Sequence, residues 1–442
     1  MENEKMLELS DIASQLKMNI ADIVLNFKKI GIHVSENPKD KISITQFEIL
    51  KNDVERIKFI KRIEIKKLWG THDVEWDLDI KTNILIGENG SGKSSIINLM
   101  NAVINEGQSE VEDKSKYSYK FDEIIIFFDN GRILFYKKVA NDKTQVNDML
   151  DKVHSTVELS KNVMEDAKKY LKETPLKIFN LEPFNVEFTS VGGGYWATNI
   201  PKKDRKNITD LIDILRISTF DDYLKESKLV EFVSRDAYIN TELDIELRRI
   251  SSRFISYQLK LKKVEAERIA QIENQIRELA TKDSADFKEL ENLRSNLKEI
   301  EKIKADIHKR KNDFINTVNE LFKNRSFPEL NKTIGFDKDN DIIFSKEDKS
   351  IVRIDQLSSG EKQILLILLT VLLQEDKNGI LLMDEPEISL HLKWQIELID
   401  TIQKLNPNLQ IIISTHSAGI FKKAKWDEKT IEISRLFKNS KN

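Results

Sequence analysis

The stretch 87–94, Gly-Glu-Asn-Gly-Ser-Gly-Lys-Ser, constrains the fold of this chain more than any other. It follows the apolar run 84–86 and precedes a helix-like pattern at 96–100. A strand, a glycine-rich turn and a helix, in that order, form the backbone of a phosphate-binding loop. The glycines let successive N–H groups face one anion, and the positive end of the helix dipole adds to the attraction. The sequence therefore predicts a phosphate site here.

The residues of this loop have expected contacts. Lys93 supplies a cation for the outer phosphates, and Ser94 supplies a hydroxyl for Mg²⁺. A chance glycine-rich turn is the alternative, but the Lys-Ser pair at this offset is specific to phosphate loops. The expected nucleotide contacts are Gly87, Glu88, Asn89, Gly90, Ser91, Gly92, Lys93, Ser94 and Ser95.

Composition limits the class of protein. The chain has 442 residues, enough for two or three domains, and 33% of them are charged, which indicates a heavily charged surface. No apolar run approaches the ~18 residues that span a membrane, and residues 1–5 lack the pattern of a signal peptide. The absence of cysteine excludes disulfides, thiolate nucleophiles and cysteine zinc sites. We expect a cytoplasmic protein with no membrane partner, and a net charge of −3 requires a local patch for any DNA or RNA contact.

Residues 1–54 have the pattern of a small helical domain. Polar residues stand where helix caps are expected: Ser10 before a helix to about residue 16, Asn19 before one over 20–30, and Ser43 or Thr45 before a third. The runs 9–13 and 20–32 resemble the small N-terminal domain of bacterial translation initiation factor two. That resemblance implies a docking or nucleic-acid module. Helix packing alone gives the same pattern, so both interpretations stay open.

Residues 55–240 combine strands with the phosphate loop. The stretch 62–68 alternates apolar and charged residues, as a half-buried strand does. Two β-rich runs, 123–129 and 132–139, are separated by Asn-Gly, which predicts a hairpin. The basic cluster 201–206 follows an aromatic pair, a mixture that suits nucleic acid, although a solvated loop is the preferred interpretation.

Residues 241–325 predict a long helical hairpin. Apolar residues step by three and four on either side of the polar break 281–285, and no glycine or proline interrupts them. At ~1.5 Å per residue, an arm of ~37 residues reaches roughly 55 Å. We expect a protruding arm that docks a partner; a helical bundle packed on the core is the alternative.

Residues 326–442 return to dense motif content. Here Ser359 and Gly360 stand at the start of a helix, and a helix start is again an anion-binding geometry. The run 364–373 is apolar nearly all round, which predicts a buried helix. A second phosphate contact is therefore expected near residue 360.

Two further apolar runs end in polar residues. The run 380–383 precedes Asp384 and Glu385, and the run 411–413 leads to His416. Polar residues at the carboxyl ends of buried parallel strands gather at one edge of the sheet. Asp384 is placed to hold Mg²⁺ through water, and Glu385 to orient or deprotonate the attacking water. We expect His416 to contact the γ-phosphate; a structural histidine is the alternative.

These stretches carry a family resemblance. Residues 87–94, 357–363, 382–387 and 414–416 match, in order, the Walker A, signature, Walker B and switch-histidine motifs of ABC-type ATPases. Residues 384–391 resemble the SMC-like and OLD-like branch of that family. The resemblance implies an α/β fold: an ABC-type P-loop core of mixed β-sheet flanked by helices, with an antiparallel coiled-coil insertion and a small N-terminal helical domain.

The resemblance also implies an assembly and a metal site. In the family a dimer sandwiches two ATP molecules with Mg²⁺, so Lys93 of one subunit would face Ser359, Gly360 and Glu361 of the other, in a homodimer or higher homo-oligomer. Related ATPases have a glutamine that senses Mg²⁺ and the attacking water. Gln145 lies downstream of the loop as that glutamine does, but no local motif supports it, and a surface glutamine is the preferred interpretation.

The type of ATPase follows from what accompanies the motifs. OLD-type nucleases carry a metal-dependent TOPRIM domain after the ATPase, and residues 417–442 are too few for one, so we expect no nuclease site. The chain is similar to the ATPase subunits of two-component anti-phage systems such as Septu, whose partner is an HNH nuclease, and PARIS, whose partner is a TOPRIM-like effector.

The resulting hypothesis is an ATP-gated sensor and scaffold that controls a separate effector nuclease docked on the helical arm. The alternative is a DNA repair or recombination ATPase of the SMC or RecF kind, acting as a clamp on DNA. A translation-linked ATPase is a third hypothesis, which rests only on the resemblance of residues 1–54.

Overall fold

The structure is a computed structural model that describes residues 6–16, 18–29, 32, 34–55, 57–105, 121–129, 133–138, 187–191, 194–198, 214–217, 241–280, 287–323, 327–375 and 377–438. The chain separates into two compact units. The first comprises Met1–Ile80, Asn98–Ile214 and Ser434–Asn442, and the second comprises Lys81–Ile97 and Leu215–Ile433. Among the described helices, none is both long and apolar enough to cross a membrane. The division into segments 1–54, 55–240, 241–325 and 326–442 stays a prediction.

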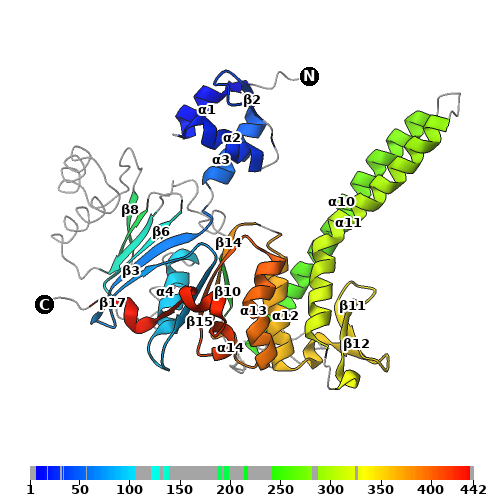
Figure 1. Ribbon diagram of the computed structural model, residues 1–442. Coiled ribbons are helices and arrows are strands. Elements are labelled where there is room, and N and C mark those ends of the chain that lie inside the picture. The colour runs from blue at the N-terminus through cyan, green and yellow to red at the C-terminus, as the bar shows by residue number, and fades with distance from the viewer. Residues whose placement is uncertain are drawn as a thin grey trace. The chain divides into compact units, whose positions relative to one another are not determined.

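The N-terminal part of the first unit is a small mixed domain, dark blue in Figure 1. Its elements are β1 (Met6–Glu8), α1 (Leu9–Leu16), α2 (Ile20–Lys29), β2 (Lys41–Ser43) and α3 (Ile44–Glu55). The three expected helices are present, but β1 also pairs antiparallel with β2, which the sequence did not reveal. The core of this domain is apolar and buried: Leu9, Ile12, Ile23, Phe27, Ile42, Phe47 and Leu50.

Two of its helix starts show how the cap predictions fared. Asn19 caps α2, because its Oδ1 accepts a hydrogen bond from the backbone N–H of Asp22 at 2.8 Å. The prediction for Ser10 is wrong, since α1 begins at Leu9 and contains Ser10. The backbone N–H of Leu9 donates to the carbonyl of Asp40 at 2.9 Å, so backbone rather than a side chain satisfies this end of α1.

The rest of the first unit is built on an antiparallel seven-stranded sheet. Its order is β17 (Phe437–Lys438), β4 (His72–Asp77), β3 (Ile60–Leu68), β6 (Glu123–Phe128), β7 (Ile133–Lys138), β9 (Gly194–Thr198) and β8 (Glu187–Val191). The expected strands β3, β6 and β7 are present, and β6 pairs with β7 in the register Ile125↔Phe135. The Asn130-Gly131 turn and the basic cluster 201–206 lie outside the described residues.

The second unit contains a five-stranded sheet that positions the motifs. Its order is β10 (Ile214–Ile217), β14 (Gly379–Asp384), β15 (Leu409–Ser414), β5 (Thr82–Ile86) and β16 (Thr430–Glu432). The three central strands run parallel, with Asp384 opposite Ser414 and Ser414 opposite Leu85. The loops that follow these strands therefore leave the sheet at the same edge, as expected for an α/β sheet.

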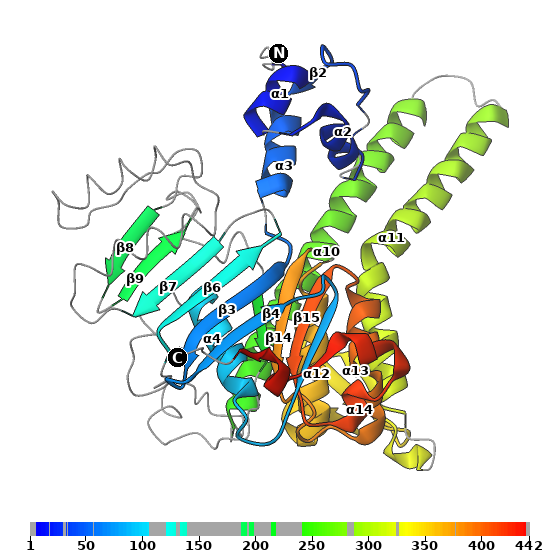
Figure 2. The same cartoon turned by 60° about the vertical axis from the view of Figure 1, so that its left-hand side comes forward.

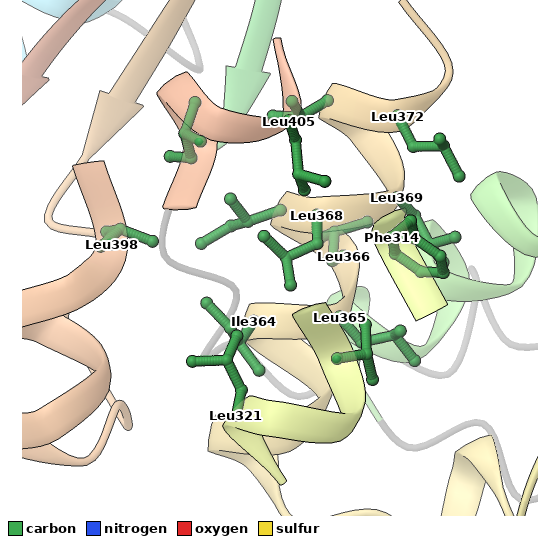
Figure 3. Close-up of a cluster of buried hydrophobic side chains, with 14 of the residues drawn as sticks. Phe314, Leu321, Ile364, Leu365, Leu366, Leu368, Leu369, Leu372, Leu398 and Leu405 are labelled. Carbon is green, nitrogen blue, oxygen red and sulfur yellow. The ribbon is translucent and has the colours of Figure 1, made fainter. Parts of the chain in front are cut away.

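A buried helix, α12 (Ser359–Leu372), lies at the centre of the second unit. The expected apolar run is buried on nearly every side, although the helix begins earlier than residue 364. Figure 3 shows leucines of α12 packed between Phe314 and Leu321 of α11 (Phe287–Leu321) and Leu398 and Leu405 of α13 (Leu392–Leu405). Residues 359–361 form the first turn of α12, so this packing fixes their position in the unit.

The predicted helical hairpin is present as α10 (Glu242–Ala280) and α11, 39 and 35 residues long. Figures 1 and 2 both show the two helices running side by side away from α12 and α13. The base of this segment packs on the core, as the alternative interpretation expected, and the helices continue beyond it; docking of a partner stays a prediction. The base is core, because Leu247 and Phe254 of α10 are buried in the main cluster of the unit, whereas the tip extends away from it. The polar break 281–285 lies outside the described residues.

A three-stranded antiparallel sheet completes the second unit. It comprises β11 (Thr333–Phe336), β12 (Ile342–Ser345) and β13 (Ile351–Arg353), which precede α12 in the chain. The short helix α4 (Lys93–Asn105) follows β5, as the phosphate-loop pattern predicts. A short helix, α14 (Ala418–Phe421), follows β15.

Candidate functional site

The glycine-rich stretch forms a tight loop between β5 and α4. Gly90 and Gly92 have φ angles of +76° and +96°. A residue with a Cβ adopts such angles only with strain. A Cβ on Gly87 would lie 2.9 Å from the Oγ of Ser91 and 2.7 Å from Ile433. The loop thus needs glycine both for its curvature and for its closeness to its neighbours.

Lys93 folds back over this loop. Its Nζ donates to the carbonyls of Gly87 and Glu88, each at 3.1 Å, and lies 2.6 Å from the Nε2 of His416. Burial lowers the pKa of Lys93, against the opposing pull of carboxylates that include Glu385. Among the described residues, this ammonium group bonds two neutral carbonyls and an imidazole, which suits an incoming anion.

Two carboxylates follow β14. Asp384 is buried at the end of the strand and accepts a hydrogen bond from the hydroxyl of Ser414 on β15. Glu385 has a φ of +45°, and its backbone N–H donates to the carbonyl of Ser414 at 2.9 Å. Its Oε1 lies 3.0 Å from the Nε2 of His416. The turn at Glu385 thus separates a buried carboxylate from a partly exposed one.

His416 links the two sides of the site. It follows β15, and the neighbouring Thr415 donates its backbone N–H to the carbonyl of Leu85 on β5 at 3.0 Å. The imidazole Nε2 meets both the Nζ of Lys93 and the Oε1 of Glu385. Residues more than 300 positions apart in the chain are therefore in direct contact, as the parallel strand order requires.

Glu387 is a residue that the sequence reasoning placed in a motif without a role. Its Oε1 accepts hydrogen bonds from the hydroxyl of Thr415 at 2.7 Å and from the backbone N–H groups of His416 and Ser417 at 2.8 and 3.1 Å. The available signal was the Asp-Glu-Pro-Glu sequence at 384–387. That sequence does not indicate contact with a loop some thirty residues further on.

The signature stretch forms a separate feature. Ser358 caps α12 in a reciprocal pair with Glu361, and Lys332 donates to both oxygens of Glu361 at 2.7 Å. A groove of about 960 Å³ borders this helix start, with Gly360, Glu361 and Trp394 in its lining. Within the described part of this single chain, no hydrogen bond or ion pair joins Ser359 or Gly360 to Lys93, Glu385 or His416.

The loop fits a nucleotide phosphate. The Oγ of Ser91 is buried and has no hydrogen-bond partner among the described residues, so an acceptor or donor from outside the chain would satisfy it. Ser94 and Ser95 occupy the first turn of α4, directly after Lys93. Glu88 and Asn89 complete the loop between β5 and Gly90.

The site also fits Mg²⁺ held largely by nucleotide and water. In the part of the chain that the structure describes, no group of three or more His, Asp or Glu side chains is placed to bind a metal by itself. Mg²⁺ in phosphate sites takes one or two protein ligands and completes its shell with phosphate and water. The hydroxyl of Ser94 and the carboxylate of Asp384 could supply those ligands. Gln145, the third expected metal contact, lies outside the described residues.

Comparison with curated proteins gives two informative relatives. The chain is 26% identical to "Retron Vc95 probable ATPase" of Vibrio cholerae serotype O1 biovar El Tor over 372 residues, 76% of this chain and 66% of that protein. It is 36% identical to "Retron Ec83 probable ATPase" of Escherichia coli over 91 residues, 18% of this chain and 17% of that protein. The chain thus matches less than two thirds of the length of either relative.

Solved structures and family models complete the comparison. The Smc head domain of Pyrococcus furiosus, with an extended coiled coil and bound to the C-terminal domain of ScpA, aligns with a TM-score of 0.38 at 16% identity, over 82% of this chain and 90% of that one. The family model described as "AAA ATPase domain" matches residues 59–421. This span includes every site residue placed above, and the chain belongs to the AAA ATPase domain family.

Proposed function

We propose that this protein binds ATP with Mg²⁺ at the phosphate loop and hydrolyses it there. The observation that carries the proposal is the contact of one imidazole nitrogen, Nε2 of His416, with both the Nζ of Lys93 and the Oε1 of Glu385. A cation for phosphate oxygens and a carboxylate for water thus meet at one point. The family match supports the same reaction.

Each side chain has a role that follows from its place. Lys93 neutralises charge on the outer phosphates, and the loop N–H groups bind the same oxygens. Mg²⁺, when bound through Ser94 and Asp384, withdraws charge from the phosphates. Glu385 orients or deprotonates the attacking water, because it is the carboxylate of the pair that stays partly exposed. His416 holds Glu385 on one side and the phosphate end on the other.

The signature stretch acts on a second copy of the chain in this proposal. The start of α12 offers N–H groups beside Ser359 and Gly360, but it borders its own groove, apart from Lys93. A helix start attracts phosphate. In the proposed homodimer, each copy supplies this helix start to the nucleotide bound at the phosphate loop of its partner. Assembly of the dimer then depends on ATP.

The biological role that we infer is that of a sensor and scaffold in a defence system. Two curated relatives are probable ATPases of retrons. Among the described residues, the main core cluster takes side chains from the base of the hairpin of α10 and α11. The tip would then be available for an effector protein, such as an HNH or TOPRIM-like nuclease. ATP-driven dimerisation would then change how that effector is held.

Replacing the water-activating carboxylate tests the enzymatic part. The variant Glu385→Gln keeps the shape of the side chain but removes the base, so kcat for ATP hydrolysis should fall at least about 100-fold. ATP-dependent dimerisation, followed by light scattering after size-exclusion chromatography, should persist. The matched control is Glu347→Gln, on the loop between β12 and β13, which should hydrolyse ATP at the wild-type rate. Undiminished turnover in Glu385→Gln would remove the assigned base.

A DNA clamp is the second candidate function. The stretch 248–268 of α10 contains seven Lys or Arg residues against two Glu, in a chain whose net charge is −3. Arg253, Lys263 and Arg268 are exposed there. The test measures ATP hydrolysis with double-stranded DNA at rising salt concentration. Stimulation by DNA that weakens as the salt concentration rises would favour this function over effector control.

A further inference from the structure

Glu387 connects two loops that the sheet places side by side. It lies in the turn after β14, and its Oε1 accepts three hydrogen bonds from the loop after β15. The donors are the hydroxyl of Thr415 at 2.7 Å, the N–H of His416 at 2.8 Å and the N–H of Ser417 at 3.1 Å. One carboxylate oxygen thus holds three consecutive residues.

The middle residue of the three is the one that reaches the reacting groups. The backbone of His416 is fixed by Glu387, and its imidazole meets the Nζ of Lys93 at 2.6 Å and the Oε1 of Glu385 at 3.0 Å. The side chain of His416 is 30% exposed, so packing encloses it only in part. The direction of the imidazole therefore depends on the hydrogen bonds at its backbone.

We propose that Glu387 is a positioning residue for ATP hydrolysis: it holds the loop 415–417 so that His416 points at Lys93 and Glu385. Glu387 contacts none of the reacting groups itself, and it acts through the histidine. This inference deepens the proposed ATPase function and rests on it.

The hydrogen bonds of Glu387 indicate that its acceptor oxygen matters more than its negative charge. Its second oxygen, Oε2, is buried and has no hydrogen-bond partner among the described residues. A buried oxygen of a carboxylate without a partner is unfavourable, and a neutral amide of the same shape would reduce that cost. The positioning needs one acceptor oxygen in one place. Glutamine can provide that oxygen, and alanine cannot.

A second attachment holds the far end of the loop. On α13, the Oε1 of Gln395 accepts a hydrogen bond from the hydroxyl of Ser417 at 2.5 Å. The Nε2 of Gln395 donates to the carbonyl of Leu390 at 2.8 Å. The far end of the loop is therefore anchored independently of the Glu387 side chain. Removal of that side chain should loosen the direction of His416 without unfolding the turn.

The test compares two substitutions at this position in the full chain. Glu387→Ala should lower kcat for ATP hydrolysis roughly 10- to 100-fold, since small displacements of a catalytic group have effects of this size. The Kd for a fluorescent ATP analogue and the melting temperature should stay close to wild type. Glu387→Gln should retain kcat within about threefold, because its amide oxygen still accepts the three hydrogen bonds.

The matched control is another carboxylate that accepts backbone hydrogen bonds in a turn. The Oδ1 of Asp337 accepts from the N–H groups of Asp339 and Asp341, both at 2.9 Å, in the β11–β12 turn. Asp337→Ala removes a similar set of contacts elsewhere, and kcat should be unchanged.

Three results would overturn the inference. They are a wild-type kcat in Glu387→Ala, equal losses in the Gln and Ala variants, and a loss of nucleotide affinity that accounts for the whole effect. If Glu387→Ala melts much earlier than wild type, Thr415→Val removes one of the three donors with little change in shape, and its kcat must then fall. Failure of the proposed function would appear differently, as a wild-type protein that does not hydrolyse ATP.

Discussion

At Gly360 the backbone of α12 approaches the turn after β14 more closely than any side chain would permit. A Cβ at this position would lie 2.3 Å from the carbonyl oxygen of Ser389 and 3.7 Å from Trp394. The obstacle is a backbone atom, so it cannot move aside as the end of a side chain could. The need for glycine here is therefore a matter of packing, besides any contact with phosphate.

The variant Gly360→Ala tests this packing. It should lower the free energy of unfolding by about 1–3 kcal/mol or more, measured by urea titration of the nucleotide-free protein. Gly335→Ala in β11 is the control, because its nearest neighbour would be Ile343 at an ordinary 3.9 Å, and it should change stability by less than about 0.5 kcal/mol. A Gly360→Ala protein as stable as wild type would contradict the close approach.

The sequence predicted the positions of those site residues that follow a recognisable motif or strand. Asp384 and His416 were predicted because buried runs precede polar residues, and the structure places Asp384 at the end of β14 and His416 two residues after β15. Lys93 was predicted from its offset in the glycine-rich loop, and it lies at the start of α4. Their chemical roles stay predictions. The contacts of Glu387 could not be predicted, because they depend on the loop after β15, which comes next to it only in the folded sheet.

Among the elements, α12 is tied to the base of the helical arm by a buried ion pair. The Nζ of Lys362 lies 2.8 Å from Asp244 of α10, and the two side chains are only 13% and 8% exposed. Lys362 belongs to the signature stretch 357–363 and directly follows Glu361. The pair thus connects the arm to the helix that carries this stretch.

Loss of one partner should be costly, because it leaves a buried charge unpaired. Asp244→Ala should reduce the free energy of unfolding by about 3–5 kcal/mol. Arg249→Ala breaks an exposed pair with Glu246 on the same helix, in which the arginine is 72% exposed, and should cost about 0–1 kcal/mol. Equal effects of the two variants would show that the Lys362 pair is no stronger than a surface pair.

Several of the elements that the sequence missed are very short strands. β1, β2 and β11–β13 contain three or four residues each, too few for an alternating pattern to stand out. The long helices α10 and α11 were predictable because their apolar spacing continues over many turns. That spacing could not show that Leu247 and Phe254 face the core of the unit, since a helix in a coiled coil and one on a core repeat alike.

For the whole molecule, the division between core and arm is the feature with the clearest consequence. The main cluster takes residues of α10 from Leu243 to Tyr257 and of α11 from Phe314 to Leu321. Further along, Glu265 pairs with His308 across the hairpin at 2.8 Å. The arm can thus be shortened beyond this pair without touching the core.

Replacing residues 269–303 with a short Gly/Ser linker should leave ATP hydrolysis and the melting temperature unchanged. The same protein should no longer retain the proposed effector in a pull-down that retains it with the full-length chain. A loss of ATP hydrolysis would show that the tip takes part in the reaction, and retention of the effector would place its binding site elsewhere on the protein.

The backbone conformation of Glu385 has one more implication. A non-glycine residue at a φ of +45° is strained by about 1–3 kcal/mol, and proteins tolerate this mainly where surrounding contacts force it. Evolution could have relaxed this corner with glycine or asparagine, and would then have lost the carboxylate. The backbone is therefore strained at the residue that is proposed to activate the attacking water, which makes this corner a poor place to engineer for heat tolerance.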